Sequence, residues 1–416
     1  MTGRLPYHVL QQTDHVDRNM KMLPAKLKEA GYRTHQVGKW HLGLLAPWMT
    51  PHGRGFDTSL GYLAGGEDHY SQYQNKAKVF GCVGTDLYDT DKPAIGRNGT
   101  YGAYIYNAEV QRVIAAHDAT DKAHPLMMYI ATQVMHAPQQ VPDVWKNLYN
   151  DPKYSDDYQI MQGMASASDE VLGNTTAALK AKGMWNNTLL IYTSDNGGPS
   201  GQAASGHSGN NWPLRGGKTN NFEGGVRVAS FVSGGFVPAS VGGSARDGYM
   251  HVADWYPTLC GLAGVNASDG GPGWPDIDGH DMWPYVTGKA ADSPRTEIML
   301  SSEDTGALIS GDFKLILGVQ SYGFWTAPNY PNASTDHKSE KTVDCKATGC
   351  LFNIREDPSE YHDLAASNPS KLAEMQALFK KRNATAFEAP KRNKDAGGCQ
   401  AFVDANGGFL GPYMDD

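Results

Sequence analysis

The segment PLMMYIATQVMHAP at residues 125–138 decides the fold class that the sequence predicts. Its first six residues form a continuous apolar run after polar residues, which is typical of a strand buried on both faces of a sheet. Apolar residues then recur at helical spacing between 161 and 179, and a second apolar strand is predicted at 189–193. Strand, helix and strand in this order form a crossover unit, so we expect an α/β fold.

The chain on either side of this unit continues the same alternation. Toward the amino terminus, Pro24 at a first helical turn and Gly31 just past a helix end outline a short helix. A strand is predicted directly after it at 33–37, and another at 228–232 beyond a glycine-rich loop. We therefore expect one large mixed, mostly parallel sheet with helices on its faces.

The pattern changes after about Arg295. Short alternating strands such as 313–317 follow, and then a helix near 371–382. These features are typical of a small antiparallel sheet with one helix. The predicted division is an α/β domain at 1–295 and a smaller α+β domain at 296–416.

The charge balance excludes some partners. The chain has 36 Lys and Arg against 44 Asp and Glu, a net charge of −8, which argues against nucleic acid or an anionic membrane surface. No stretch approaches the roughly 20 apolar residues of a membrane span. The five cysteines include no CxxC pair, so a zinc ribbon is not supported, although Cys345 and Cys350 could bridge a loop.

Six Asn-x-Ser/Thr tripeptides indicate passage through the secretory pathway, with a lysosomal or extracellular destination. No signal peptide is visible at the amino terminus, so we expect that the beginning of the protein is missing. The six asparagines are Asn98, Asn174, Asn186, Asn266, Asn332 and Asn383.

Polar side chains of the types that bind ions or transfer protons follow the predicted strands, and in one case precede a strand. In doubly wound sheets ligands bind beyond the carboxyl ends of the strands, so these segments should meet at one edge. The candidate site residues are Lys39, His41, His136, Asp195, Asn196 and Lys218.

Each candidate also has an ordinary structural interpretation. Asp-Asn-Gly-Gly at 195–198 is a strong turn sequence, a lysine in a glycine loop is usually solvated, and a single histidine is more often structural than catalytic. Together they describe another chemistry. Carboxylate and amide oxygens suit Ca²⁺ or Mg²⁺, lysines suit a tetrahedral anion, and histidines exchange protons near neutral pH. This combination predicts hydrolysis of a phosphate or sulfate ester.

Gly31-Tyr32-Arg33-Thr34 running into Gly38-Lys39-Trp40-His41-Leu42-Gly43 closely resembles the second signature of the sulfatase family. Four further segments that resemble sulfatase sequence follow in the same order, beginning at 136, 194, 214 and 351. Segments 54–57, 61–63 and 66–68 are most similar to the arylsulfatase B, or N-acetylgalactosamine-4-sulfatase, branch.

The resemblance implies roles for the candidates. Asp195 and Asn196 match calcium ligands, and Lys39 and Lys218 match lysines that hold the sulfate, with Lys39 also near the nucleophile. His136 matches the histidine that helps the leaving alcohol depart. The remaining histidine, at position 41, matches the one that assists sulfate release. The implied substrate is a sulfate ester, possibly of a sulfated polysaccharide.

The amino terminus departs from the family pattern. Met1-Thr2-Gly3-Arg4 resembles the tail of the first signature, Cys or Ser-x-Pro-Ser-Arg followed by Thr-Gly-Arg. The resemblance implies that the cysteine converted to formylglycine and the tandem aspartates that complete the calcium site precede Met1. We therefore expect a chain truncated before its nucleophile.

Two alternatives remain at this stage. One is a phosphate or phosphonate ester hydrolase of the same superfamily, and the other is a non-catalytic relative that binds sulfated glycan. A nucleotide-binding loop at 216–219 is not supported, because Trp212 stands where the earlier glycine is needed.

Overall fold

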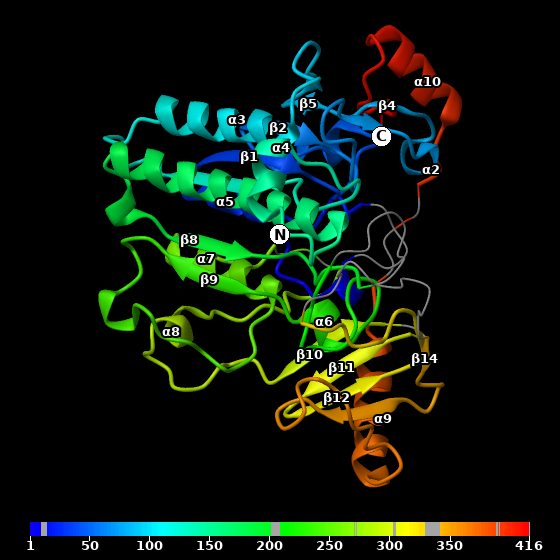
Figure 1. Ribbon diagram of the computed structural model, residues 1–416. Coiled ribbons are helices and arrows are strands. Elements are labelled where there is room, and N and C mark those ends of the chain that lie inside the picture. The colour runs from blue at the N-terminus through cyan, green and yellow to red at the C-terminus, as the bar shows by residue number, and fades with distance from the viewer. Residues whose placement is uncertain are drawn as a thin grey trace.

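The computed structural model describes residues 1–9, 15–200, 209–269, 271, 273–302, 305–328, 342–387, 390 and 392–415. Asn332, one of the six predicted glycosylation sites, lies outside these residues. Figure 1 shows an upper lobe that contains β1, β2 and α3 and a lower lobe that contains β10, β11 and β12. Among the described residues, no helix combines the length and the apolar character that crossing a membrane requires.

The largest sheet has five strands in the order β6 (Lys92–Pro93), β5 (Tyr88–Asp89), β2 (Thr58–Tyr62), β1 (Arg33–Lys39) and β7 (Leu126–Ala131). The central strand β1 runs parallel to both β2 and β7, whereas β5 and β6 are antiparallel additions. The sheet is therefore mixed, and it confirms the predicted fold class.

Helices cover both faces of this sheet. On one face α3 (Gly102–Ala116) packs against β1 and β2, and α5 (Asp156–Ala181) lies beside α3 (Figure 1). On the other face α1 (Leu23–Glu29) packs against β1 and against α7 (Trp255–Leu262). The predicted strand and both predicted helices of this region are thus present, and Gly31 follows α1 with a φ of 84°.

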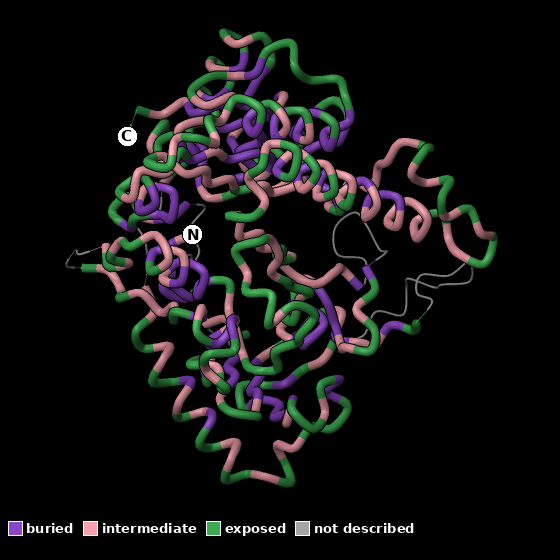
Figure 2. Tube along the Cα trace, turned by 90° about the vertical axis from the view of Figure 1, so that its left-hand side faces the viewer, coloured by how far each residue is buried: buried purple, intermediate pink, exposed green. Residues whose placement is uncertain are grey.

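The second half of the predicted crossover unit lies apart from this sheet. β8 (Leu190–Thr193) pairs with β9 (Ser230–Ser233) in an antiparallel two-stranded sheet, so the prediction that 189–193 joins the sheet of residues 125–130 is wrong. The expected full burial of this earlier strand is wrong too, because Tyr129 on β7 is 36% exposed. Figure 2 shows buried stretches gathered in the upper lobe. The outer edge of β7 lacks a neighbouring strand among the described residues.

The carboxyl-terminal lobe matches its prediction. Four antiparallel strands follow the order β10 (Glu297–Ser301), β11 (Ala307–Ser310), β12 (Phe313–Ile316) and β15 (Cys350–Asn353), and α9 (Pro369–Asn383) packs against β11 and β12. The predicted Cys345–Cys350 bridge is present as a disulfide. The remaining elements are α2 (Ala77–Phe80), α4 (Asp143–Lys146), α6 (Glu223–Val226), α8 (Trp283–Val286), β3 (Tyr73–Gln74), β4 (Gly84–Thr85), β13 (Val319–Gln320) and β14 (Val343–Asp344).

The end of the chain returns to the amino-terminal lobe. A disulfide joins Cys82 to Cys399 on α10 (Ala396–Ala405) across 317 residues of sequence. Thr85 donates its N–H to the carbonyl of Gly408 and accepts the N–H of Leu410. The division at residue 295 remains a proposal, in which this terminal segment is covalently attached to the first lobe.

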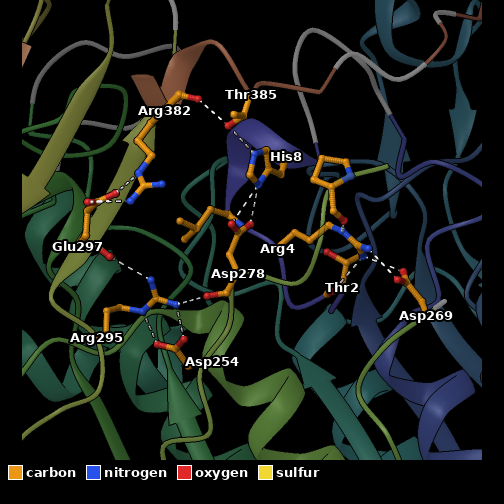
Figure 3. Close-up of polar contacts among 12 residues, drawn as sticks. Thr2, Arg4, His8, Asp254, Asp269, Asp278, Arg295, Glu297, Arg382 and Thr385 are labelled. Carbon is orange, nitrogen blue, oxygen red and sulfur yellow. Dashed lines mark hydrogen bonds and ion pairs between the residues drawn. The ribbon is translucent and has the colours of Figure 1, made fainter. Parts of the chain in front are cut away.

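A buried ionic network fixes the amino-terminal residues against distant segments of the chain (Figure 3). Arg4 forms two hydrogen bonds of 2.8 Å with Asp269, and His8 Nδ1 lies 2.9 Å from Asp278 Oδ2. The guanidinium of Arg295 contacts Asp254 and donates to the carbonyl of Asp278 at 2.9 Å. Residues 1–9 are therefore fixed against segments more than 240 positions away in sequence.

Candidate active site

The carboxyl end of β1 presents Lys39 and His41. Pairing with the end of β2 continues past the strand, since the N–H groups of Trp40 and His41 donate to the carbonyls of Tyr62 and Leu63. Trp40 is buried, and its Nε1 donates to the carbonyl of Met49 at 2.8 Å. This anchor holds the turn at His41, whose φ of 56° lies in the left-handed region.

Two consecutive glycines after β2 place the two histidines next to the same stretch of backbone. A Cβ on Gly65 would lie 2.6 Å from Cε1 of His41, and a Cβ on Gly66 would lie 2.8 Å from Cε1 of His136. Any larger residue at either position would collide with an imidazole. The candidate site residues did not include this glycine pair, although Gly66 begins one of the segments that resemble sulfatase sequence.

The surroundings of His136 define its protonation state. Its Nδ1 lies 2.7 Å from the carbonyl of Ala137, so Nδ1 carries the proton and Nε2 is the acceptor. Burial lowers the pKa of His136 to about 4, and the positive charges of Lys218 and Lys39 add to this effect while Asp195 opposes it. His136 is therefore neutral near pH 7 without a bound anion.

Lys218 reaches the same place through the loop after β8. Its N–H donates to the carbonyl of Gly198 at 3.1 Å. The Asn211 side chain links the two loops by hydrogen bonds. It accepts the N–H of Gly198 at 2.9 Å, and it donates to the carbonyls of Gly198 at 2.8 Å and Gly216 at 2.9 Å. The loop at 194–198 and the loop at 214–218 thus form one unit.

Lys39 connects this unit to β1. Its Nζ lies 3.9 Å from Oδ2 of Asp195. Burial lowers the pKa of Lys39, with Lys218 adding to the effect and Asp195 opposing it. The structure therefore brings Lys39, Lys218, His136 and Asp195 within electrostatic range, and Gly65 and Gly66 keep His41 beside His136. Although β7 and β8 belong to different sheets, the loops that follow them still meet.

Asp195 and Asn196 offer hard oxygen ligands. The Asp195 side chain is 70% exposed, and Asn196 donates with Nδ2 to the carbonyl of Gly197, which leaves its Oδ1 as an acceptor. Both oxygens suit Ca²⁺ in kind, but Ca²⁺ takes 6–8 oxygen ligands. In the described part of the chain, no group of three or more His, Cys, Asp and Glu could hold a metal ion. These two residues fit part of a calcium site.

Buried acids support the glycine pair, and the sequence prediction missed them. The hydroxyl of Tyr106 donates to Glu67 at 2.8 Å, and Gln133 donates to the Glu67 carbonyl at 2.9 Å. Asp86 accepts the N–H groups of Leu63 and Ala64, both at 2.9 Å. Burial raises the pKa of Glu67 well above its ordinary value, and it raises the pKa of Asp86 to about 6.

A second buried cluster supports the Lys218 loop from the carboxyl-terminal lobe. Nζ of Lys314 on β12 lies 2.9 Å from Glu223 and 3.0 Å from Glu360, and all three side chains are at most 4% exposed. Glu360 also accepts the N–H of Glu223 at 2.7 Å. Its own backbone carbonyl accepts a hydrogen bond of 3.2 Å from Arg215, three residues before Lys218. The loop is therefore held by both lobes.

Comparisons with known proteins identify the relatives of this chain. Residues 1–265 match the family model described as Sulfatase. The chain is 34% identical to arylsulfatase J from Mus musculus over 94% of its own length, and 29% identical to N-acetylgalactosamine-6-sulfatase from Sus scrofa over 86%. It spans 66% of the length of each of these relatives.

One similar solved structure is Ps i-CgsB in complex with k-i-k-neocarrahexaose. The TM-score is 0.73 and the sequence identity 26%, and the match covers 97% of this chain and 85% of that one. With the family model matching well over half of its residues, the chain belongs to the sulfatase family.

Proposed function

We propose that the protein is a sulfuric ester hydrolase that acts on sulfated glycans, and that the site at the end of β1 holds the sulfate group. The observation that carries this proposal is the convergence of two ammonium groups and two imidazoles beside Asp195. A tetrahedral anion fits between Lys39 and Lys218, because a partly buried site strengthens its attraction to both.

The histidines would move protons at the two ends of the reaction. A bound sulfate ester is negative, so it would offset the lysines and raise the pKa of His136 above its value of about 4 in the free site. Protonated at Nε2, His136 could then donate to the leaving alcohol. His41, on the neighbouring glycine, would assist sulfate release.

The proposed cation is Ca²⁺, with Mg²⁺ as the alternative, and it would supply Lewis-acid stabilisation of the sulfate oxygens. Asp195 and Asn196 would provide two of its ligands. The family mechanism uses a formylglycine nucleophile, and none of the five cysteines in residues 1–416 stands in a Cys-x-Pro-Ser-Arg context. We therefore expect this chain to bind sulfate esters with negligible turnover of an aryl sulfate. Robust turnover would refute this expectation.

Sulfate binding tests the site directly. Inorganic sulfate should bind in calorimetry, and Lys218→Ala should weaken it about 10- to 100-fold, the effect of losing one charge-assisted hydrogen bond. The matched control is Lys380→Ala on α9, which is exposed and far from the site. Unchanged sulfate affinity in Lys218→Ala would refute the proposal. A preference for phosphate over sulfate would favour the phosphate or phosphonate ester hydrolase instead.

We also propose that the protein passes through the secretory pathway. Two disulfides suit an oxidising compartment. Of the five asparagines in Asn-x-Ser/Thr tripeptides that the structure describes, three are exposed: Asn98, Asn186 and Asn266.

A further inference from the structure

We propose that two exposed tyrosines beside the reaction centre bind an uncharged sugar ring, the neighbour of the sulfated ring in a glycan substrate. This inference rests on the proposed function and deepens it, because it concerns which glycans the site accepts. The Tyr70 platform consists of Tyr70, Tyr104 and Asp143, which come from the loop after β2, from α3 and from α4.

The two exposed rings are fixed by a buried one. Tyr70 is 39% exposed and Tyr104 is 38% exposed. Both contact the buried ring of Tyr101, with centroid distances of 5.2 Å and 5.5 Å. The indole N–H of Trp145 donates to the Tyr104 hydroxyl at 3.2 Å, and the Tyr101 hydroxyl donates to the carbonyl of Gln140 at 3.1 Å. The rings are therefore held in place before a ligand binds, which lowers the entropic cost of binding.

The loop that carries Tyr70 also contacts the reaction centre. Nε2 of His69 lies 2.9 Å from the carbonyl of His136, and the backbone of Gly66 lies against the His136 imidazole. Four residues of chain separate Gly66 from Tyr70, and four residues span at most about 14 Å even when fully extended. A sugar ring joined to the reacting one is therefore within reach of Tyr70.

The groups that act on the Tyr70 hydroxyl include no cation. Burial raises the pKa of Tyr70, and Tyr104, Asp143 and Asp68 add to this effect in decreasing order. Asp68 is occupied within its own loop, because its Oδ1 accepts the N–H groups of Tyr70 at 3.0 Å and Ser71 at 2.8 Å. Asp143 is thus the acid that remains available to a ligand at the platform.

The charge of Asp143 is not offset by an ion pair in the described part of the chain. Its side chain is exposed, and the lysine one turn further along α4, Lys146, pairs instead with Asp156. A carboxylate beside an aromatic ring accepts hydrogen bonds from sugar hydroxyls. It also repels a second sulfate or a carboxylate on the same ring.

The chemistry of the site therefore differs between its two ends. Lys39 and Lys218 attract the sulfate group at one end. At the other end, the faces of Tyr70 and Tyr104 suit the apolar face of a sugar ring, and Asp143 suits its hydroxyls. This arrangement selects glycans in which an uncharged ring is joined to the sulfated one.

Lightly sulfated dextran tests the platform, because most of its rings are uncharged and its sulfates are spread over several hydroxyl positions. Tyr70→Ala/Tyr104→Ala should weaken its binding about 5- to 20-fold, since covering one tyrosine face removes roughly 50 Å² of apolar surface from water. Tyr70→Phe keeps the ring and should bind as the unaltered chain does. Inorganic sulfate affinity should not change in either variant, because neither tyrosine belongs to the reaction centre.

Heavily sulfated dextran tests the role of Asp143. Asp143→Asn should strengthen its binding about two- to fivefold at low ionic strength, because the substitution removes a repulsive charge. The control is Asp118→Asn, an exposed position beyond the opposite end of α3, which should leave the affinity unchanged.

The matched control for the tyrosines is Phe236→Ala. Phe236 is 40% exposed, and its N–H donates to the carbonyl of Thr188 at the end of β8 that lies away from Asp195. Circular dichroism checks that each variant folds. If the double variant does not fold, Tyr70→Ala and Asp143→Asn, both at exposed positions, still test the inference.

Three outcomes would overturn the inference. Affinity for lightly sulfated dextran could stay unchanged in the tyrosine variants, it could fall equally in Phe236→Ala, or inorganic sulfate affinity could fall with it, which would mean that the tyrosines only position His136. In all three, weaker sulfate binding in Lys218→Ala would leave the proposed function intact. Tyrosine-dependent dextran binding without any binding of inorganic sulfate would support the Tyr70 platform and refute the proposed function.

Discussion

Replacement of Lys314 by methionine should expose how the Lys218 loop is held. Lys314 Nζ lies 2.9 Å from Glu223 and 3.0 Å from Glu360, and its side chain has no solvent exposure. At an effective dielectric constant near 20, each contact contributes about 5–6 kcal/mol of gross Coulomb attraction. Methionine has a similar length, so the substitution removes the charge and leaves two buried carboxyl groups without a cation.

Protonation limits the cost and makes it depend on pH. In the unaltered chain, burial already raises the pKa of Glu360 from 4.5 to about 7. In the variant, the buried carboxyl groups lose the cation that favours their charged form. Protonating an ordinary glutamate at pH 7.5 costs about 4 kcal/mol, from three pKa units at roughly 1.4 kcal/mol each. We expect Lys314→Met to lose about 3–5 kcal/mol of unfolding free energy at pH 7.5 and only about 1 kcal/mol of ionic origin near pH 5.

The sign follows from linkage. Carboxyl groups with a raised folded-state pKa stabilise the folded state at low pH, and this contribution is lost as pH rises through the folded-state pKa. Urea unfolding near pH 5 and near pH 7.5 measures both values, with exposed Lys380→Met as the control. Lys314→Met/Glu223→Gln/Glu360→Gln should recover much of the loss at pH 7.5. An equal penalty at both pH values would mean that packing, and not charge, explains the effect.

Three further predictions concern other parts of the fold. Between pH 4 and pH 7, the unfolding free energy of Asp86→Asn should rise by up to about 3 kcal/mol relative to that of the unaltered chain. Burial raises the Asp86 pKa from 3.8 to about 6, so the unaltered chain loses stability over that range and the asparagine variant does not. A difference in urea unfolding that stays constant with pH would contradict this. Cys399→Ser should cost about 2–5 kcal/mol, since the Cys82–Cys399 disulfide closes a 317-residue loop; an unchanged melting temperature would contradict it. The chain should be poorly soluble because, in the part that the structure describes, no strand pairs with the outer edge of β7, and Tyr129 is 36% exposed. A sharp, reversible melt in circular dichroism would contradict that expectation.

Local patterns predicted individual elements more reliably than their pairing. The helix at 161–179 and the strand at 313–317 carry their own periodicity, and the structure places α5 and β12 there. The partner of β8 is a separate matter, because two strands with equally apolar sequences can join one sheet or two. That choice depends on which other strands are available beside them, which no periodicity within residues 189–193 records.

The same distinction applies to the candidate site. Lys39, His136 and Lys218 could be predicted because each follows or precedes a strand, and the loops meet even where the strands do not pair. Glu67 and Asp86 gave no such indication, since an acid in a sequence is normally exposed and its burial depends on contacts made by distant residues. Lys314 and Glu360 act on a loop about 90 to 140 residues away, as their contacts with Glu223 show.

The two lysines proposed to hold sulfate depend on different supports. Lys39 extends from β1, whose position is fixed by β2 and β7, whereas Lys218 depends on a loop attached to the carboxyl-terminal lobe through Glu223. Loss of Lys314 should therefore move one ammonium group and leave the other in place. Sulfate would then keep its contact with Lys39 and lose the one with Lys218, which lowers the His136 pKa more than Lys39 does. A weaker sulfate affinity in Lys314→Met, together with a higher His136 pKa measured by NMR, would show that the carboxyl-terminal lobe sets both binding and protonation in the site.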